Sequence, residues 1–173
     1  MAAVRKEKIR ISYQGGPMAK KKAILGGLYS LPVMAGVGLF QCVHVPEDKT
    51  KLHIIRVLPG IHSASYEDFR TVVDGPELFF KQFALDYGLK KSVIGYLGQY
   101  DIPDNSHAPD CFRMKDMVRG EFKGWLIVNR KTQIMQRVMS LSNKQIQLSP
   151  YGSISIPDLE EKILTGWTPK MWN

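Results

Sequence analysis

The sequence predicts a single compact α+β domain in which β-hairpins pack against a few short helices, preceded by a basic N-terminal arm. The chain has 173 residues, of which 44% are hydrophobic and 23% are charged, and this is ordinary for one globular domain. Strand-like apolar runs and capped helical patterns are mixed without a βαβ rhythm, which favours α+β. Positive charge gathers at the start, so we expect a flexible arm over residues 1–22 and a folded core over 23–173.

The arm carries most of the formal net charge of +8. Its only acid is Glu7, and this excess of positive charge suits an anionic partner, either nucleic acid or an acidic membrane. A solubilising tail is the alternative, because charged runs often do no more than stay solvated. The candidate binding residues of the arm are Arg5, Lys6, Lys8, Arg10, Lys20, Lys21 and Lys22.

Residues 23–46 carry no formally charged side chain, and their number alone would permit a membrane span. Four glycines and Pro32 interrupt the run, and VGLFQCVHV is typical of a strand. We therefore expect a buried hairpin over 37–58, in which PEDKT is the turn and KLHIIRVL the second strand. Peripheral contact is the remaining membrane hypothesis, and its candidates for dipping into the bilayer are Leu28, Tyr29, Leu31 and Met34.

Two helices are expected next. SASYEDFRTVVDG has Ser65 as its N-cap and Gly75 as its end, and GPELFFKQFALDYG has Pro76 at its first position and Gly88 at its end. The second helix would present an aromatic stripe to the core. This stripe consists of Phe79, Phe83 and Tyr87.

The rest of the chain predicts short elements. The segment 90–102 is compatible with a strand or a helix, and 101–110 has the composition of a loop. Residues 121–140 predict two strands joined by a turn, although the second could be helical. SISI at 153–156 predicts a short strand, and PDLEEKILTG predicts a helix that begins with its proline.

No catalytic motif is present in the sequence. There is no nucleophile elbow, phosphate-binding loop or dinucleotide fingerprint, so we expect no enzyme and no cofactor. Cys42 and His44 lie two apart on a predicted strand, with His53 on the next, but a further ligand is missing and we expect no metal site. Two cysteines without a C-x-x-C pair favour a reducing compartment.

One order of segments resembles a known family. LHIIRVL is followed by SYEDFRTVV, then KKSVIGYLGQYDI, FRMKDM and FKGWLIV. This order is similar to the core of rhabdovirus matrix proteins, in which a Ser/Thr-Tyr-x-Asp helix start precedes a basic-led apolar segment ending in Leu-Gly. The chain looks most like matrix proteins of plant-infecting cytorhabdoviruses, over about residues 37–140.

The resemblance implies a viral assembly protein of the virion, the host cytoplasm and the cytoplasmic face of host membranes. It would self-associate as a homo-oligomer, condense the viral nucleoprotein–RNA complex and bridge it to the anionic inner leaflet during budding, with a glycoprotein cytoplasmic tail as a further partner. YSLP is not the budding motif of animal members. The loop expected to mediate self-association is polar here and offers Ile102, Pro103 and Pro109.

A second hypothesis is a single-stranded RNA-binding viral accessory protein, such as a silencing suppressor or movement factor. The same basic arm supports it, together with seven tyrosines and seven phenylalanines. Those aromatic residues lie at core spacing, however, and do not alternate with Lys or Arg as on a stacking platform. The matrix interpretation is therefore the first hypothesis.

Overall fold

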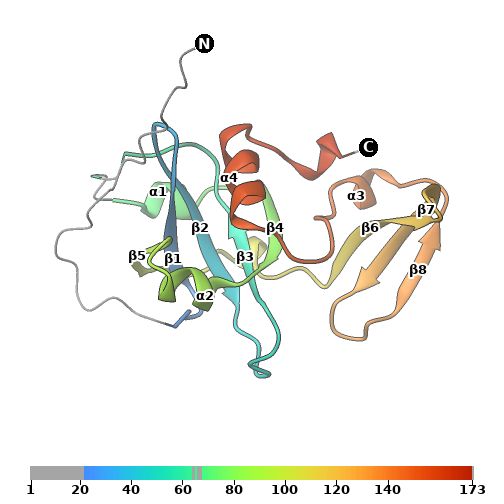
Figure 1. The fold of residues 1–173 in the computed structure, drawn as a ribbon, viewed down its shortest axis with the longest axis horizontal. Helices are drawn as coiled ribbons and strands as arrows, with labels where there is room; N and C mark the ends of the chain where they lie inside the picture. The colour runs from blue at the N-terminus through green and yellow to red at the C-terminus, as the bar shows by residue number, and fades with distance from the viewer. Residues whose placement is uncertain (1–21, 64, 66–67, 173) are drawn as a thin grey trace, which may run out of the picture.

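The computed structural model describes residues 22–63, 65 and 68–172, and it confirms the α+β class. Its strands form two antiparallel sheets, a large sheet in the order β4-β3-β2-β1-β5 and a small sheet in the order β6-β7-β8 (Figure 1). The two sheets lie at opposite ends of the long axis. The strands are β1 (Gly27–Val33), β2 (Gly36–His44), β3 (His53–Val57), β4 (Phe79–Phe83), β5 (Gly95–Gln99), β6 (Cys111–Val118), β7 (Glu121–Asn129) and β8 (Met135–Val138).

The helices are short. They are α1 (Arg70–Val73), α2 (Leu85–Lys90), α3 (Asn143–Ile146) and α4 (Ile156–Leu164), with 3-10 turns at η1 (Asp104–Ser106) and η2 (Pro169–Met171). The helix predicted from PDLEEKILTG is confirmed as α4, whose N-cap Ser155 accepts a hydrogen bond from the backbone N–H of Asp158. The strand predicted over 153–156 is reduced to one bridge, between Ser153 and Gln82.

The uncharged run over 23–46 forms most of an antiparallel hairpin. β1 pairs with β2, and β2 pairs with β3, which confirms the hairpin predicted over 37–58. Strand β1 was not predicted, because its flanking glycines and Pro32 are usually signs of a broken element. Gly36 is required at the turn, since a Cβ there would lie 2.4 Å from the carbonyl oxygen of His62. No described helix is long and apolar enough to cross a bilayer.

The large sheet is covered by helices on both faces, which explains why its strands are apolar on both sides. Helix α1 covers one face, where Phe69 and Val73 pack against Leu39. Helices α2 and α4 cover the other face, where Leu85 and Ile163 belong to the larger core cluster. That cluster consists of Tyr29, Leu31, Phe40, Cys42, Ile55, Val57, Phe79, Phe83, Leu85, Leu89, Ile94, Ile154, Leu159 and Ile163.

Both helices predicted over 65–88 need correction. The first begins at Arg70 rather than at the Ser65 cap, and Tyr66 and Glu67 lie outside the described residues. The second is wrong, because its first half is strand β4 and only Leu85–Lys90 is helical. Residues four apart share a face in a strand as well as in a helix, so the aromatic spacing could not separate the two.

The aromatic stripe is accordingly divided. Phe79 and Phe83 are buried, each 2% exposed, as predicted for core residues. Tyr87 is 59% exposed, so its assignment to the core is wrong. The strand ends at Phe83 and the chain turns into α2, which removes Tyr87 from the line of the other two rings.

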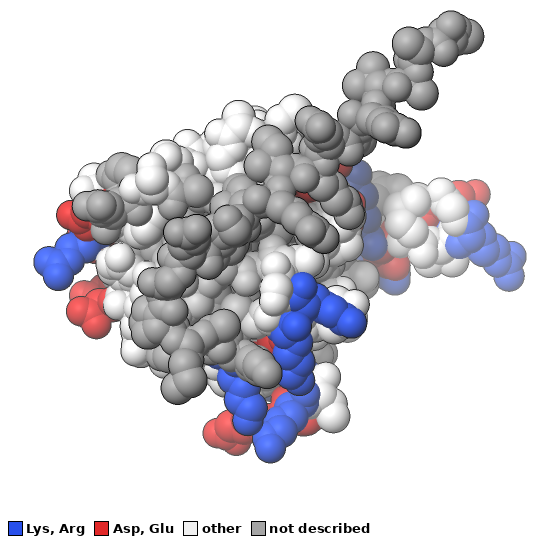
Figure 2. Space-filling model, turned by 60° about the vertical axis from the view of Figure 1, so that its left-hand side comes forward, with Lys and Arg blue, Asp and Glu red and all other residues white. Residues whose placement is uncertain are grey.

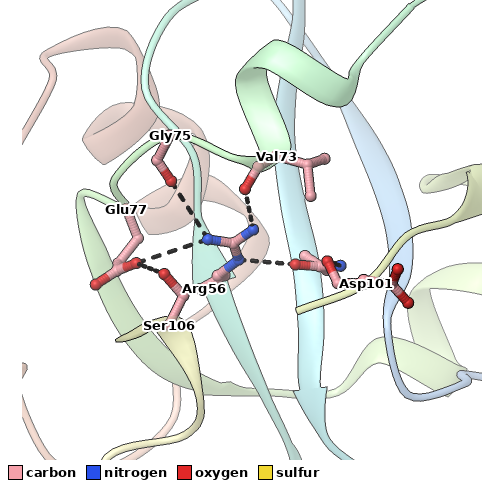
Figure 3. Close-up of polar contacts among 7 residues, drawn as sticks. Arg56, Val73, Gly75, Glu77, Asp101 and Ser106 are labelled. Carbon is pink, nitrogen blue, oxygen red and sulfur yellow. Dashed lines mark hydrogen bonds and ion pairs between the residues drawn. The ribbon is translucent and has the colours of Figure 1, made fainter. Parts of the chain in front are cut away.

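A buried arginine ties the large sheet to its surroundings (Figure 3). The Nε of Arg56 donates to Oε1 of Gln41 at 2.8 Å, and its guanidinium also donates to the carbonyl oxygens of Val73 and Gly75. Nη1 of Arg56 also lies 3.7 Å from Oε2 of Glu77. Each nitrogen of the guanidinium thus has a polar partner, as a buried cation requires.

The small sheet confirms the strand–turn–strand prediction for 121–140, with β8 as its second limb. Residues 112–117 form most of the third strand, β6, which pairs with β7. The segment 90–102, for which the sequence left strand or helix open, contains β5. The predicted loop 101–110 contains only the short turn η1.

Candidate functional site

The arm residues Arg5, Lys6, Lys8, Arg10, Lys20 and Lys21 lie outside the described part of the chain, and Lys22 is exposed. The next residue fixes the point at which the arm joins the core. The backbone N–H of Ala23 donates to Oδ1 of Asp86 in α2, at 2.7 Å. The arm therefore meets the folded core beside α2.

Helix α2 adds positive charge at this junction. Lys90 and Lys91 are exposed, and Nζ of Lys91 lies 5.8 Å from the ring centroid of the exposed Tyr87. Val93, two residues after Lys91, is 38% exposed. We call Lys22, Tyr87, Lys90, Lys91 and Val93 the α2 surface.

Figure 2 brings forward the side of the molecule on which α1, α2 and β5 lie, and at its lower edge Lys and Arg side chains gather with some Asp and Glu among them. The α2 surface combines three exposed lysines with an exposed tyrosine ring and an exposed aliphatic side chain. Amphipathic tyrosines and lysines of this kind suit the boundary between water and a membrane. Sequence reasoning missed Lys90 and Lys91 as site residues, because two adjacent lysines after an apolar stretch carry no positional signal.

Three of the four candidates for dipping into a membrane are buried in this fold. Leu28, Tyr29 and Leu31 lie in β1 and are at most 3% exposed, because a strand in the middle of a sheet covered on both faces has no free side. Met34 occupies the β1–β2 turn and is 76% exposed, so it alone among the four is available to a partner in this fold.

The loop predicted for self-association is docked against the core. Ile102 packs on the cluster formed by Val43, Ile54 and Phe112. Pro103 and Pro109 are half-buried, and their carbonyl oxygens accept hydrogen bonds from the backbone N–H of Ser106 and from Nε of Arg130. These residues offer little apolar surface to a second copy.

The cysteine and histidines considered for a metal do not form a site. The strand register shifts between Cys42 and His44, so the alternation that would place both on one face is lost. The Cys42 thiol is buried, which raises its pKa to about 12, and it donates to the carbonyl oxygen of His44. Among the described residues, no three His, Cys, Asp or Glu side chains are grouped closely enough to hold an ion.

Exposed apolar residues gather instead on and beside the small sheet. They include both residues before the β6–β7 turn, one after it, and several along the β8 segment. These are Met117, Val118, Phe122, Ile134, Met135 and Met139, between 45% and 74% exposed. Strand β8 is also an edge, since within the described chain it pairs only with β7. Exposed apolar side chains and an open strand edge are features of association surfaces.

A pocket of about 350 Å³ opens on one face of the same sheet. Its described lining combines two cations, three aromatic rings and two aliphatic side chains, and none of these residues is acidic. The lining residues are Arg113, Lys115, Phe122, Trp125, Leu141, Ile146 and Trp172. The sequence analysis did not identify this site, because Trp172 lies far from Arg113 in the chain and only the fold brings them together.

The fold and these surfaces define an α+β protein that has a basic surface at one end and an exposed apolar sheet at the other. Comparison with family models, curated proteins and solved structures found no match for this chain. Its function is therefore argued from its own geometry.

Proposed function

We propose that this chain is a viral matrix-type assembly protein that self-associates, condenses a nucleoprotein–RNA complex and bridges it to an anionic inner membrane leaflet. The observation that carries the proposal is the junction of the basic arm with the α2 surface. The hydrogen bond from Ala23 to Asp86 sets the last arm residue, Lys22, beside a helix that exposes Lys90 and Lys91. Arm and core can thus act on one anionic surface.

The energetics favour a peripheral, electrostatic attachment. Each Lys or Arg near an anionic leaflet contributes about 1 kcal/mol, and such attraction is screened over about 8 Å at physiological ionic strength. The arm alone has seven bases and one acid, which sets a ceiling of roughly 6 kcal/mol on that scale. Tyr87 and Val93 would add a small apolar contribution at the interface.

The small sheet supports the self-association half of the proposal. Its exposed methionines and its open β8 edge provide a surface that a second copy can cover. Because this sheet lies on the right of Figure 1 and α2 lies left of the centre, self-contact through the sheet would leave the α2 surface free for the membrane. A layer of copies could then present basic surfaces to one side.

Vesicle co-sedimentation across a salt series tests the attachment. We expect full-length protein to bind phosphatidylserine-containing vesicles at low salt and to be released as salt rises. Deletion of residues 1–22 should leave the fold intact and weaken binding strongly. Charge reversal at Lys20, Lys21 and Lys22 should reproduce much of that loss, and Lys90→Gln with Lys91→Gln a smaller part.

The matched control is Lys123→Gln with Lys144→Gln, which removes the same charge from exposed residues on or near the small sheet. It should bind vesicles nearly as the parent does. Equal binding by the full-length and truncated proteins, or binding that does not respond to salt, would mean that the arm is a solubilising tail and would overturn this part of the proposal.

A further inference from the structure

Arg113 is the central feature of the pocket on the small sheet. It lies in β6 and is 1% exposed, yet no carboxylate pairs with it among the described residues. One terminal nitrogen donates to the carbonyl oxygens of Pro169 and Trp172. Its Nε has no hydrogen-bond partner within the described chain. A donor left unpaired on a buried cation lowers the stability of the fold.

Two tryptophan rings hold this cation in place. The guanidinium carbon of Arg113 lies 4.7 Å from the ring centroid of Trp125 and 5.2 Å from that of Trp172. Nζ of Lys115 lies 5.6 and 5.9 Å from the same two rings. Two positive groups are therefore held beside the same two rings, and no acid is among the described residues that line the pocket.

The third ring provides an open surface. Phe122 stands at 73° to Trp125, with ring centroids 5.7 Å apart, and Trp125 meets Trp172 at 84°. Phe122 is 48% exposed, whereas Trp125 is 8% exposed. Leu141 and Ile146 complete the apolar part of the lining. A flat apolar group can thus lie against Phe122 while an attached anion approaches the two cations.

We propose that this pocket binds one nucleotide unit of single-stranded RNA, with the base against Phe122 and a phosphate beside Arg113 and Lys115. Sequence-tolerant binding of single strands combines aromatic stacking with positive charge, and both stand here within one pocket. The volume of about 350 Å³ is within the range of sites for small molecules, so it suits one unit of the strand rather than a duplex. The inference goes beyond membrane attachment, because the pocket is built entirely from residues 113–172.

Strands β6 and β7, which supply four of the lining residues, lie on the right of Figure 1, away from α2. One copy could therefore hold RNA at the small sheet while its α2 surface faces an anionic membrane. An acidic lipid headgroup offers phosphate without a flat ring, and it would leave Phe122 without a stacking partner. This difference makes Phe122 the residue that separates RNA from lipid.

The test measures binding of a fluorescein-labelled 12-nucleotide single-stranded RNA to the full-length protein by anisotropy. Phe122→Ala removes a half-exposed ring and no charge, so it should fold normally and weaken binding about 5- to 10-fold, with an unchanged salt slope. Lys115→Gln should weaken binding and lower the salt slope by about 1. Adenosine monophosphate should quench the fluorescence of the parent protein, since two of its three tryptophans line the pocket.

Two variants serve as controls on the same sheet. Lys123→Gln removes an exposed lysine of β7 that is outside the pocket, and Met135→Ala removes an exposed apolar side chain of β8. Both should bind RNA like the parent. The inference is overturned if Phe122→Ala binds RNA as tightly as the parent, or if Lys123→Gln loses as much affinity as Lys115→Gln, because the basic arm alone would then account for binding. Loss of vesicle binding but not of RNA binding in Phe122→Ala would assign the pocket to lipid and overturn it as well.

Discussion

Each of the two sheets contains a buried arginine, but the two arginines differ in their hydrogen-bond partners. In the large sheet, Arg56 contacts Gln41, Glu77 and the carbonyl oxygens of Val73 and Gly75. The hydrogen bond to Val73 connects the sheet to α1. In the small sheet, Arg113 is equally buried but lies close to two tryptophan rings, and its Nε has no hydrogen-bond partner among the described residues. Because both side chains are hidden from solvent, burial alone does not separate a structural cation from a site-forming one. What separates the two is whether each guanidinium nitrogen has a hydrogen-bond partner among the described residues.

The apolar residues follow the same division. The large sheet has helices on both faces and hides its rings and aliphatic chains. The small sheet buries Phe112, Trp125 and Val128 but leaves several methionines and Phe122 exposed. We infer that the large sheet carries most of the free energy of folding and that the small sheet carries much of the surface for partners. Variants can test this division directly.

The largest expected effect is on the large sheet. Phe83→Ala removes a ring that is 2% exposed and meets Phe40 edge to face, at 5.7 Å between centroids. The lost transfer free energy and the cavity should lower the free energy of unfolding by about 3–5 kcal/mol. Urea denaturation followed by circular dichroism measures it. Phe122→Ala, the same substitution on the small sheet, should cost much less, and equal losses at the two sites would abolish the distinction between the sheets.

A second, smaller effect concerns a buried lysine of the large sheet. Lys81 in β4 is 8% exposed, and its Nζ donates to the carbonyl oxygens of Pro150 and Tyr151 at 3.0 Å. Burial, with a further contribution from the charge of Lys162, lowers the pKa of Lys81 from 10.5 to about 8. The unfolded chain therefore binds more protons than the folded one above pH 8, and stability should rise with pH from that point.

The rise should amount to about 1 kcal/mol between pH 8 and 9. Above pH 9 the Cys42 thiol opposes it, because burial raises the pKa of that thiol from 9.0 to about 12 and the unfolded chain then loses its proton first. Urea denaturation at pH 7, 8, 9 and 10 should thus give an increase followed by a plateau. Lys81→Met should remove most of the increase, whereas the exposed Lys90→Met should keep it; a parent protein whose stability is flat from pH 7 to 9 would contradict the assignment.

Much of the large-scale organisation could be predicted from the sequence. The hairpin over 37–58 and the α4 helix have strong local signals, namely β-branched runs, turn residues and a capped amphipathic pattern. Strand β4 was mistaken for a helix because residues four apart satisfy both periods, and β1 was missed because its glycines and proline are tolerated by the surrounding pairing. Local propensity gave way to tertiary pairing in both cases.

The candidate site was less predictable, for a related reason. The arm is visible in the sequence because charge is a compositional signal, but its junction with α2 depends on a contact between residues 23 and 86. The pocket likewise depends on a contact between distant residues, the hydrogen bond from Arg113 in β6 to the carbonyl oxygen of Trp172. Leu28, Tyr29 and Leu31 were assigned to a membrane because an uncharged apolar run has the same composition whether it is buried in protein or in lipid.

The smallest effect on stability should accompany a large effect on association. Met135 and Met139 are 51% and 74% exposed, so Met135→Thr with Met139→Thr removes little buried area, and threonine suits a strand edge. The free energy of unfolding should change by no more than about 0.5 kcal/mol. If the small sheet is the surface for a second copy, the same change removes apolar area from that contact and places hydroxyl groups beside the open β8 edge. Sedimentation velocity over a range of concentrations should then show weaker self-association than in the parent.

The matched control lies on the large sheet, where Leu25→Thr with Met34→Thr alters two apolar residues that are 52% and 76% exposed. It changes exposed area of the same kind but leaves β8 untouched, so self-association should persist. Equal loss in both double variants would mean that association follows total exposed hydrophobicity rather than one face. Unchanged association in the Met135 and Met139 variant would remove the small sheet from the self-contact and leave its exposed methionines to another partner.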